Sequence, residues 1–218
     1  MSLTSANRVF PKFELAVPFY GLAYEDAPLF PEWLAVPAHL AQAVAKRKND
    51  YLAGRWCAYQ LYQHFGLPWD GLPMGESGDP VWPRGFCGSI SHTRGLAIAV
   101  MSPQSEFISL GIDLEHQIAD KTAKQVHSQI VHPQEQITNN LDLTRIFSAK
   151  ESIYKALNPL LNRFIGFDEV CFYDLEKMRF KAQGRLLLDF PSGASEVVTC
   201  IQSDEWILTF YGLLAKMD

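Results

Sequence analysis

Hydrophobic positions recur at helical spacing in two long stretches of the chain. The first, Ala38–Phe65, is followed by Gly66 and Pro68, residues that commonly stand just beyond the end of a helix. The second, Phe147–Leu157, has a partly amphipathic pattern, and Thr144 with the polar residues before it can start a helix there. The pattern therefore predicts two helices, which we expect to organise the rest of the fold.

Apolar and alternating runs predict strands on both sides of the second helix. The runs before it cover 13–24, 87–91, 96–101 and 108–115, and those after it cover 169–174, 178–190, 196–201 and 206–214. Two more polar segments, 118–130 and 133–141, have a weaker helical pattern. This order of elements predicts an α+β fold with two halves, 1–105 and 106–218.

Composition narrows the classes of function. The chain has 218 residues, of which 48% are hydrophobic and 20% charged, and its net charge is −5. These values predict a globular protein that binds neither nucleic acid nor a membrane surface, so an anionic ligand must meet a local cluster of bases. The longest apolar runs, such as 96–101, are too short to cross a bilayer, and the first residues lack the layout of a signal peptide.

Cysteine usage indicates a reducing compartment. Four cysteines are scattered at Cys57, Cys87, Cys171 and Cys200, without a CxxC pair. This spacing favours neither a zinc site nor a disulfide framework, and it predicts a cytoplasmic protein.

Three carboxylates are the first candidates for chemistry. Asp113 and Glu115 alternate in the strand 108–115, so they point to the same face, and Glu151 lies four residues before Lys155 on a predicted helix. Carboxylates grouped in this way suit Mg²⁺, which takes a few carboxylate oxygens together with substrate phosphates. The alternatives are a solvated strand edge and an exposed Glu–Lys pair.

Hydroxyl, imidazole and guanidinium groups are the second set. Ser91 and His92 end a predicted strand, and Arg47 and Arg55 lie two turns apart on the first helix, where they could bind phosphate. A structural or merely exposed histidine and a solvated helix face are the alternatives. Ser91, His92 and Asp113 also suggest a hydrolase triad, but the sequence has no GxSxG motif.

Five motifs in order resemble those of one enzyme family. They are KRKNDYLAGRWCA at 46–58, PVWPRG at 80–85, GSISH at 88–92, GIDLE at 111–115 and FSAKESIYK at 147–155, and RFIGF at 163–167 is also similar. Together they resemble the 4′-phosphopantetheinyl transferases of the Sfp-type superfamily, and most closely the EntD-like branch. The similarity covers roughly residues 46 to 168.

The resemblance implies a fold and an activity. The fold would consist of two pseudo-symmetric halves, each a small antiparallel-rich sheet packed with a long helix, with the active site between them. The activity would be Mg²⁺-dependent transfer of the 4′-phosphopantetheine group of coenzyme A to a serine of an apo carrier protein, releasing adenosine 3′,5′-bisphosphate. The acting form would be a monomer, and the resemblance leaves open which acyl, peptidyl or aryl carrier is used.

The resemblance also implies roles for individual residues. The metal ligands would be Asp113, Glu115 and Glu151, and the diphosphate and catalytic lysines would be Lys150 and Lys155. Ser91, His92, Arg47 and Arg55 would contact coenzyme A. The N-terminal half would thus bind coenzyme A phosphates, and the C-terminal half would carry the metal and catalytic residues.

One loop departs from the family pattern. Relatives often have a lysine or arginine before the PxWP segment, whereas residues 74–79 here read MGESGD. Arg84 is the candidate replacement for that phosphate contact.

Two questions stay open at this point. The base that takes the proton from the carrier serine is Glu151 or Lys155, with Glu151 preferred. The alternative functions are a Mg²⁺-dependent phosphohydrolase acting on a nucleotide diphosphate and a non-catalytic module that binds coenzyme A or a carrier protein.

Overall fold

The chain divides into two units at the junction of Ser102 and Pro103. The structure is a computed structural model, and it describes residues 12–24, 30–75 and 78–215. The first unit contains β1 (Phe19–Ala23), the 3₁₀ turn η1 (Ala38–Leu40), α1 (Ala45–His64), β2 (Phe86–Thr93) and β3 (Leu96–Pro103). Its strands are ordered β1-β3-β2, and β1 pairs antiparallel with β3 from Phe19 opposite Val100 to Ala23 opposite Leu96.

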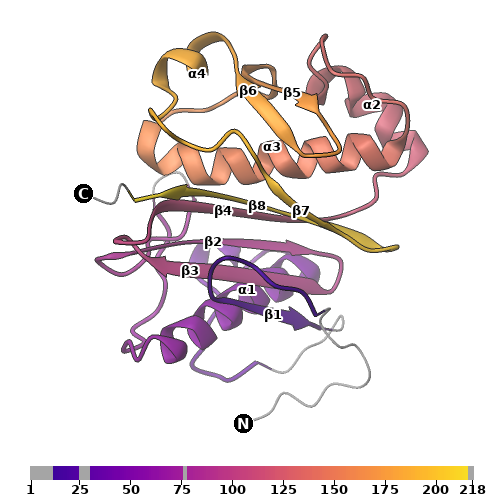
Figure 1. The fold of residues 1–218 in the computed structure, drawn as a ribbon. Helices are drawn as coiled ribbons and strands as arrows, with labels where there is room; N and C mark the ends of the chain where they lie inside the picture. The colour runs from indigo at the N-terminus through magenta and orange to yellow at the C-terminus, as the bar shows by residue number, and fades with distance from the viewer. Residues whose placement is uncertain (1–11, 25–29, 76–77, 216–218) are drawn as a thin grey trace. The chain divides into compact units, whose positions relative to one another are not determined.

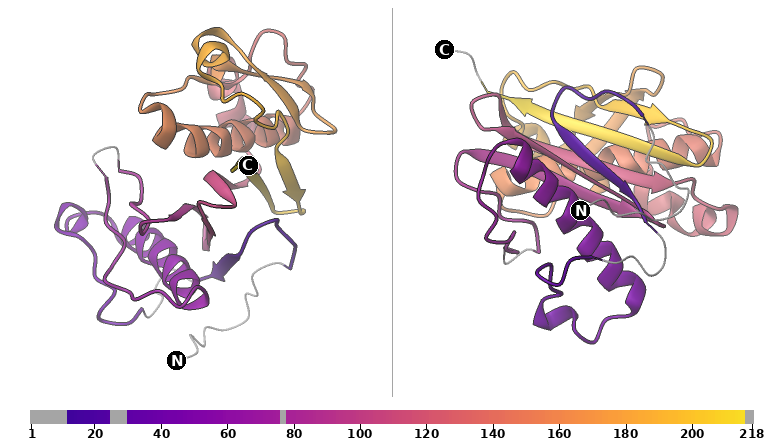
Figure 2. Two further views of the ribbon diagram at one scale, coloured as in Figure 1. Left: turned by 60° about the vertical axis from the view of Figure 1, so that its left-hand side comes forward. Right: turned by 90° about the horizontal axis from the view of Figure 1, so that it is seen from below.

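Helix α1 packs beside the sheet of the first unit (Figure 1; Figure 2). Small and medium side chains fill the core between them, namely Ala53, Cys57 and Leu61 of α1 and Ala97, Ala99 and Met101 of β3. Because alanine is the smallest side chain in this set, the helix axis can lie close to the sheet.

The predicted continuous helix over 38–65 is wrong at residues 41–44. Val44 has extended backbone angles (φ −61°, ψ 152°), so η1 and α1 are separate elements. The apolar pattern continues across the break because Leu40 is buried although it precedes α1. The helical spacing of apolar residues therefore indicated which residues are buried, but it did not show that one helix continues through residues 41–44.

The second unit combines a sheet, a long helix and a hairpin. It contains β4 (Phe107–His116), α2 (Asp120–Ile130), α3 (Asn140–Leu161), the 3₁₀ turn η2 (Phe167–Glu169), β5 (Val170–Asp174), β6 (Arg179–Ala182), α4 (Gly184–Asp189), β7 (Thr199–Gln202) and β8 (Trp206–Leu214). The strands form a sheet ordered β4-β8-β7 and a separate β5-β6 hairpin, and the paired strands in both run antiparallel. Helix α3 runs along β4 and β8 (Figure 1).

Helix α3 is longer than predicted. It begins at Asn140 because the side chain of Asn139 accepts a hydrogen bond from the backbone N–H of Asp142, at 2.9 Å. It ends where Asn162 adopts the left-handed conformation, with φ 47°. Thr144, the predicted start, lies inside the helix, where its hydroxyl donates to the carbonyl of Asn140 and accepts from the N–H of Ile118.

Two other segments differ from the prediction. Residues 133–139 form no helix, because Glu135 turns its side chain inward and accepts from the backbone N–H of His132. The strand predicted over 178–190 stops at Ala182, since Gly184 has φ 50° and starts the short helix α4. Leu186 of α4 is buried, and it supplies the apolar signal that favoured a strand.

The α+β class is confirmed, and the remaining predicted elements are present with two shortened: strand forms only over Phe19–Ala23 of the predicted 13–24, and only from Thr199 in the predicted 196–201. The strand predicted over 206–214 coincides with β8, and those predicted over 87–91, 96–101 and 108–115 lie within β2, β3 and β4. None of the described helices combines the length and the hydropathy that a membrane span requires.

Candidate active site

Asp113 and Lys155 form an ion pair in the second unit. Asp113 stands on β4 and is 3% exposed, and the Lys155 side chain from α3 is 26% exposed. The Lys155 ammonium donates to Oδ1 of Asp113 at 2.6 Å and to the carbonyl oxygen of Ile112 at 3.1 Å. The GIDLE motif of β4 and the FSAKESIYK motif of α3 therefore meet at these two side chains.

A glycine permits this meeting. A Cβ atom at Gly111 on β4 would overlap the backbone carbonyl of Ser152 and lie 2.8 Å from the backbone nitrogen of Ala156. The neighbouring Ser109 hydroxyl donates to the carbonyl of Ala156 at 2.6 Å. Strand and helix backbones are thus in direct contact, which only glycine allows at position 111.

A second polar contact fixes α3 against the sheet. The hydroxyls of Ser148 and Thr209 lie 2.9 Å apart, and Thr209 of β8 is directly opposite Asp113 of β4 in the ladder. Both hydroxyls are fully buried, so neither has water as an alternative partner. The helix position beside Asp113 is therefore specified by hydrogen bonds as well as by packing.

Glu151 completes a cluster of two carboxylates and one ammonium. Burial raises the pKa of Glu151, the nearby Lys155 opposes this, and the Asp113 carboxylate raises the pKa further. Glu115 lies two residues beyond Asp113 on β4 and is partly buried. A carboxyl whose pKa is raised in this way takes up a proton more readily than an ordinary glutamate.

The donor chemistry fits Mg²⁺ with two carboxylates. Among residues 12–24, 30–75 and 78–215, no three His, Cys, Asp or Glu side chains are grouped closely enough to hold a metal ion. Mg²⁺ is commonly held by one or two carboxylates, with waters and substrate phosphates as its other ligands. Asp113 and Glu151, which interact electrostatically, supply such a pair.

The structure does not bring Lys150 to this cluster. Its side chain is 1% exposed, and its ammonium donates to the carbonyls of Ile130 and Phe167 and to the Glu135 carboxylate. All three protons of the ammonium are used within the second unit.

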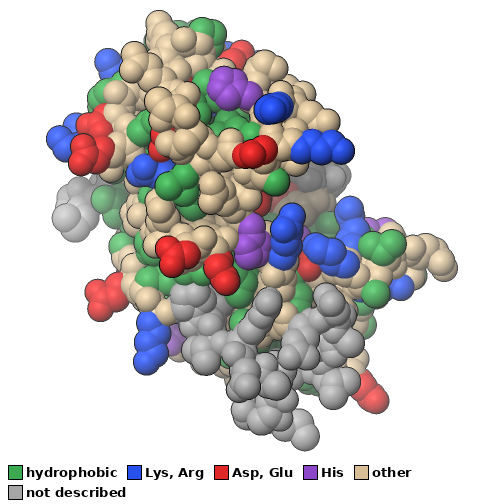
Figure 3. Space-filling view, turned by 90° about the vertical axis from the view of Figure 1, so that its right-hand side faces the viewer, with side chains coloured by type: hydrophobic (Ala, Val, Ile, Leu, Met, Phe, Trp, Pro, Cys, Tyr) green, Lys and Arg blue, Asp and Glu red, His purple; other side chains and the backbone are tan. Residues whose placement is uncertain are grey.

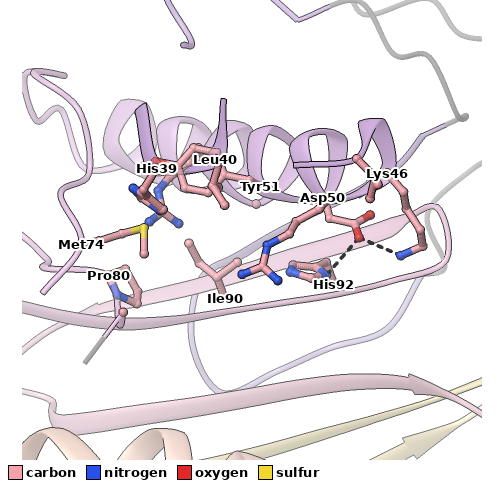
Figure 4. A pocket seen from close by; sticks show the side chains of 14 residues that line it. His39, Leu40, Lys46, Asp50, Tyr51, Met74, Pro80, Ile90 and His92 are labelled. Carbon is pink, nitrogen blue, oxygen red and sulfur yellow. Dashed lines mark hydrogen bonds and ion pairs between the residues drawn. The ribbon is translucent and has the colours of Figure 1, made fainter. Parts of the chain in front are cut away.

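A cavity of about 530 Å³ in the first unit collects the basic candidates (Figure 4). It is lined by His39, Leu40, Val44, Lys46, Arg47, Asp50, Tyr51, Gly54, Arg55, Met74, Gly78, Pro80, Ile90 and His92. Three of the predicted coenzyme A contacts, Arg47, Arg55 and His92, are thus brought together. Ser91 is buried and Arg84 is exposed, and neither is among the described lining residues.

Arg55 is the most buried cation of this cavity. It is 8% exposed, and its guanidinium lies over the Tyr51 ring, 4.5 Å from the centroid. Burial lowers the pKa of Arg55, and the Nε atom makes no hydrogen bond within the part of the chain that the structure describes. The Nε–H group of this buried guanidinium could donate to a bound anion, and such a charge-assisted hydrogen bond is strong.

Gly54 places Arg55 beside β2. A Cβ atom at Gly54 would lie 2.8 Å from Cγ2 of Ile90, so the helix approaches the strand more closely than an alanine would permit. In the helix motif, Gly54 therefore allows close packing against β2, and the next residue, Arg55, places a positive charge in the cavity.

Asp50 is a cavity residue that the sequence did not single out. Its carboxylate accepts from the Tyr24 hydroxyl at 2.6 Å and from the Lys46 ammonium at 2.8 Å, and it lies 3.8 Å from Nδ1 of His92 (Figure 4). Burial alone would raise the pKa of Asp50, but the bonds from Lys46 and Tyr24 outweigh it and hold the pKa below its usual range.

Of the two hydrogen bonds to Asp50, the sequence indicates only the one from Lys46. The spacing of Lys46 and Asp50 predicts a pair on one helix turn, but Tyr24 is 26 residues away and nothing in the sequence indicates its contact.

Two residues of the acidic loop at 74–79, Glu76 and Ser77, lie outside the described residues. On the face drawn in Figure 3, several Lys and Arg side chains gather beside a histidine, and most Asp and Glu side chains of the described residues lie elsewhere on that face.

Comparisons with known proteins match both units. The family described as "4'-phosphopantetheinyl transferase N-terminal domain" matches residues 36–102, and the "4'-phosphopantetheinyl transferase superfamily" matches residues 109–210. The 4′-phosphopantetheinyl transferase PptT of Mycobacterium tuberculosis is 33% identical over 157 residues, which are 69% of this chain and 68% of that protein.

Two further relatives are similar over shorter segments. The 4′-phosphopantetheinyl transferase Npt of Nocardia iowensis is 36% identical over 135 residues, which are 60% of each chain. Enterobactin synthase component D of Escherichia coli is 39% identical over 132 residues, which are 57% of this chain and 61% of that protein. The chain thus matches under two thirds of the length of these two relatives. The profile matches in both units and the coverage of the mycobacterial relative show that the chain belongs to the 4′-phosphopantetheinyl transferase superfamily.

Proposed function

We propose that this protein transfers the 4′-phosphopantetheine group of coenzyme A to a serine of an apo carrier protein. The observation that carries the proposal is the cluster in which Asp113, Glu151 and Lys155 meet because Gly111 allows β4 to contact α3. Two carboxylates that could hold Mg²⁺, together with one ammonium, suit a diphosphate whose bond from phosphorus to the bridging oxygen is to be broken. The names of the relatives support the same reaction.

The first unit would bind the phosphorylated adenosine end of coenzyme A. Its cavity of about 530 Å³ offers Arg47, the buried Arg55 and His92 to phosphate oxygens. The Arg55 guanidinium, with its unshared Nε, is the strongest of these candidates. Ser91 and Arg84 would then act only from outside this cavity.

The second unit would carry the transfer chemistry. Asp113 and Glu151 would hold Mg²⁺, which when bound would supply positive charge for the diphosphate oxygens, and Glu115, predicted as a third ligand, is not grouped with them among the described residues. The Lys155 ammonium now donates to Asp113, and it would donate to the diphosphate as negative charge develops there. Lys150 is omitted from the phosphate ligands because its three protons are already donated inside the unit.

Glu151 would accept the proton of the carrier serine, directly or through a water molecule. The serine oxygen then attacks the phosphorus that carries pantetheine, and the bond from that phosphorus to the bridging oxygen breaks. The electron pair leaves with adenosine 3′,5′-bisphosphate, and Lys155 stabilises the charge on that product. The raised pKa of Glu151 suits a proton acceptor, whereas Lys155 must first lose a proton to act as a base.

The test is mass spectrometry of apo carrier proteins incubated with the enzyme, coenzyme A and Mg²⁺. We expect a phosphopantetheine mass gain on at least one carrier from a panel of acyl, peptidyl and aryl carriers. The gain should be lost in a carrier whose acceptor serine is alanine and in the Asp113→Ala enzyme. Steady hydrolysis of coenzyme A without any carrier would instead support the phosphohydrolase, and binding without either reaction would support the non-catalytic module.

A further inference from the structure

Lys150 and Glu135 form a fully buried ion pair in the second unit. The Lys150 ammonium lies 3.0 Å from Oε2 of Glu135, and the two side chains are 1% and 0% exposed. The other two protons of the ammonium go to the carbonyl of Ile130, at 2.8 Å, and to that of Phe167, at 2.9 Å. The lysine therefore reaches the end of α2, the loop after it and the turn η2 from one position on α3.

Glu135 extends the same network to two further backbone groups. Its Oε2 accepts from the N–H of His132 at 2.7 Å, and its Oε1 accepts from the N–H of Phe172 on β5 at 2.8 Å. Residues 131–139 form no helix or strand, so this carboxylate supplies partners that regular structure does not. The pair thus joins α2, α3, η2 and β5 by hydrogen bonds between groups that are shielded from solvent.

An apolar side chain could not replace Lys150 in this position. The Ile130 carbonyl belongs to the last turn of α2, where carbonyl groups lack partners within the helix. A cation there also interacts favourably with the negative end of the helix dipole. For Lys150 to reach a phosphate, it would have to give up all three bonds and leave the Glu135 carboxylate buried without its counterion.

We propose that Lys150 is a positioning residue, which with Glu135 fixes the part of α3 that carries Glu151 and Lys155, and that it is not a phosphate ligand. The side chain next in sequence, Glu151, belongs to the cluster with Asp113. A loss of the buried pair would therefore let this turn of α3 move relative to β4. The activity readout of this inference rests on the proposed transferase function, whereas its stability and binding readouts do not.

The experiment compares Lys150→Met, Glu135→Gln and the double variant Lys150→Met/Glu135→Leu with the parent protein. Each single variant should lower the thermal midpoint by about 10 °C, because one buried group loses its partner. The double variant should lose less than the sum of the two single losses, since no buried charge is left unpaired although the backbone groups that the pair satisfies lose their partners. Glu135→Gln keeps the shape of the side chain and tests the pair from its other member if Lys150→Met does not fold.

Binding and turnover separate positioning from ligation. Titration calorimetry with coenzyme A, at a temperature where every variant is folded, should give affinities within about threefold of the parent for all three variants. At the same temperature kcat should fall about tenfold or more in the single variants, with KM for coenzyme A little changed. Lys155→Met is the matched control on the same helix, and it should weaken coenzyme A binding.

Three results would overturn the inference. Coenzyme A binding that weakens tenfold in Lys150→Met but not in Glu135→Gln would make Lys150 a phosphate ligand. Full kcat in the folded single variants would leave the pair with a stabilising role only. Thermal losses that add in the double variant would show that the two residues are not coupled. If the parent protein transfers nothing, the proposed function fails, while the thermal and calorimetric results still decide the role of Lys150.

Discussion

The two units place a long helix against a sheet in the same way but balance charge in opposite ways. In the first unit the cavity beside α1 has one buried carboxylate, Asp50, among several cations and histidines. In the second unit the cluster beside α3 has two carboxylates and one ammonium. The first arrangement suits an anionic ligand without a metal, and the second suits a cation together with phosphate.

The glycines that allow the close approach also differ between the units. In the first unit the glycine is on the helix, and the atom it accommodates is the end of the Ile90 side chain. In the second unit the glycine is on the strand, and the atoms it accommodates are the backbone of Ser152 and Ala156. A side chain can change rotamer, but the backbone of a long buried helix cannot move without displacing its whole turn.

The largest effect is expected for Gly111→Ala. The new methyl group would overlap the carbonyl of Ser152, so α3 must shift away from β4, and the hydrogen bond from Ser109 to Ala156 would be stretched. We expect a loss of about 3 kcal/mol or more in the free energy of unfolding, measured by urea denaturation. A midpoint equal to that of the parent would show that the contact of strand and helix backbones does not constrain the unit.

The second effect concerns the cavity of the first unit. If Arg55 binds the 3′-phosphate, Arg55→Ala should weaken coenzyme A by about 1.5–3 kcal/mol, roughly 10- to 150-fold, by loss of a charge-assisted hydrogen bond. Binding of 3′-dephospho-coenzyme A should change about threefold at most. Titration calorimetry with both ligands decides this, and Lys155→Ala in the second unit is the control, since it should weaken both ligands alike.

Equal losses of the two ligands in Arg55→Ala would contradict a specific role for this guanidinium. The cavity of the first unit would then attract coenzyme A by its overall positive charge and would not recognise the 3′-phosphate through Arg55.

The third effect is expected for Gly54→Ala, the counterpart of Gly111→Ala. Overpacking against Ile90 should cost stability, but alanine favours the helix over glycine, and the Ile90 side chain can rotate. We expect a net loss of about 1 kcal/mol in the same urea experiment. A loss as large as that of Gly111→Ala would mean that side-chain and backbone contacts constrain the two helices equally.

The sequence predicted more of the cluster in the second unit than of the cavity in the first. Alternation placed Asp113 and Glu115 on one strand face, and helical spacing placed Glu151 and Lys155 on neighbouring turns. Both patterns depend only on the geometry of a single strand or helix, so they can be predicted without knowing how the elements pack. What the sequence could not give was the ion pair between Asp113 and Lys155, which depends on the contact at Gly111 between segments 42 residues apart.

Lys150 shows why local pattern was insufficient elsewhere. It stands beside Glu151 in sequence, which favours a shared function, but successive helix positions point about 100° apart. Its partner Glu135 lies in a segment for which the pattern predicted a helix, and there the buried side chain replaces regular backbone hydrogen bonds. The same limit applied to Asp50, since its bond comes from Tyr24, which lies 26 residues earlier in the chain.

The smallest effect is a difference in pH dependence between the two units. The pKa of Asp50 is lowered on folding, although burial opposes this, because Lys46 and Tyr24 donate to the carboxylate. Its contribution to stability is therefore present above the ordinary pKa of 3.8 and is lost as pH falls below it. The pKa of Glu151 is raised, first by burial, so its contribution is present below the ordinary pKa of 4.5 and is lost as pH rises above it.

The measurement is the free energy of unfolding of Asp50→Asn and Glu151→Gln relative to the parent, between pH 3 and pH 7, without added metal ions. With falling pH the parent should lose its advantage over Asp50→Asn, whereas with rising pH it should lose ground to Glu151→Gln. The two difference curves should thus slope in opposite directions. Parallel curves would mean that the two clusters hold their carboxylates in the same electrostatic state, and the proposed contrast between a cavity suited to an anion and a cluster suited to a cation would be lost.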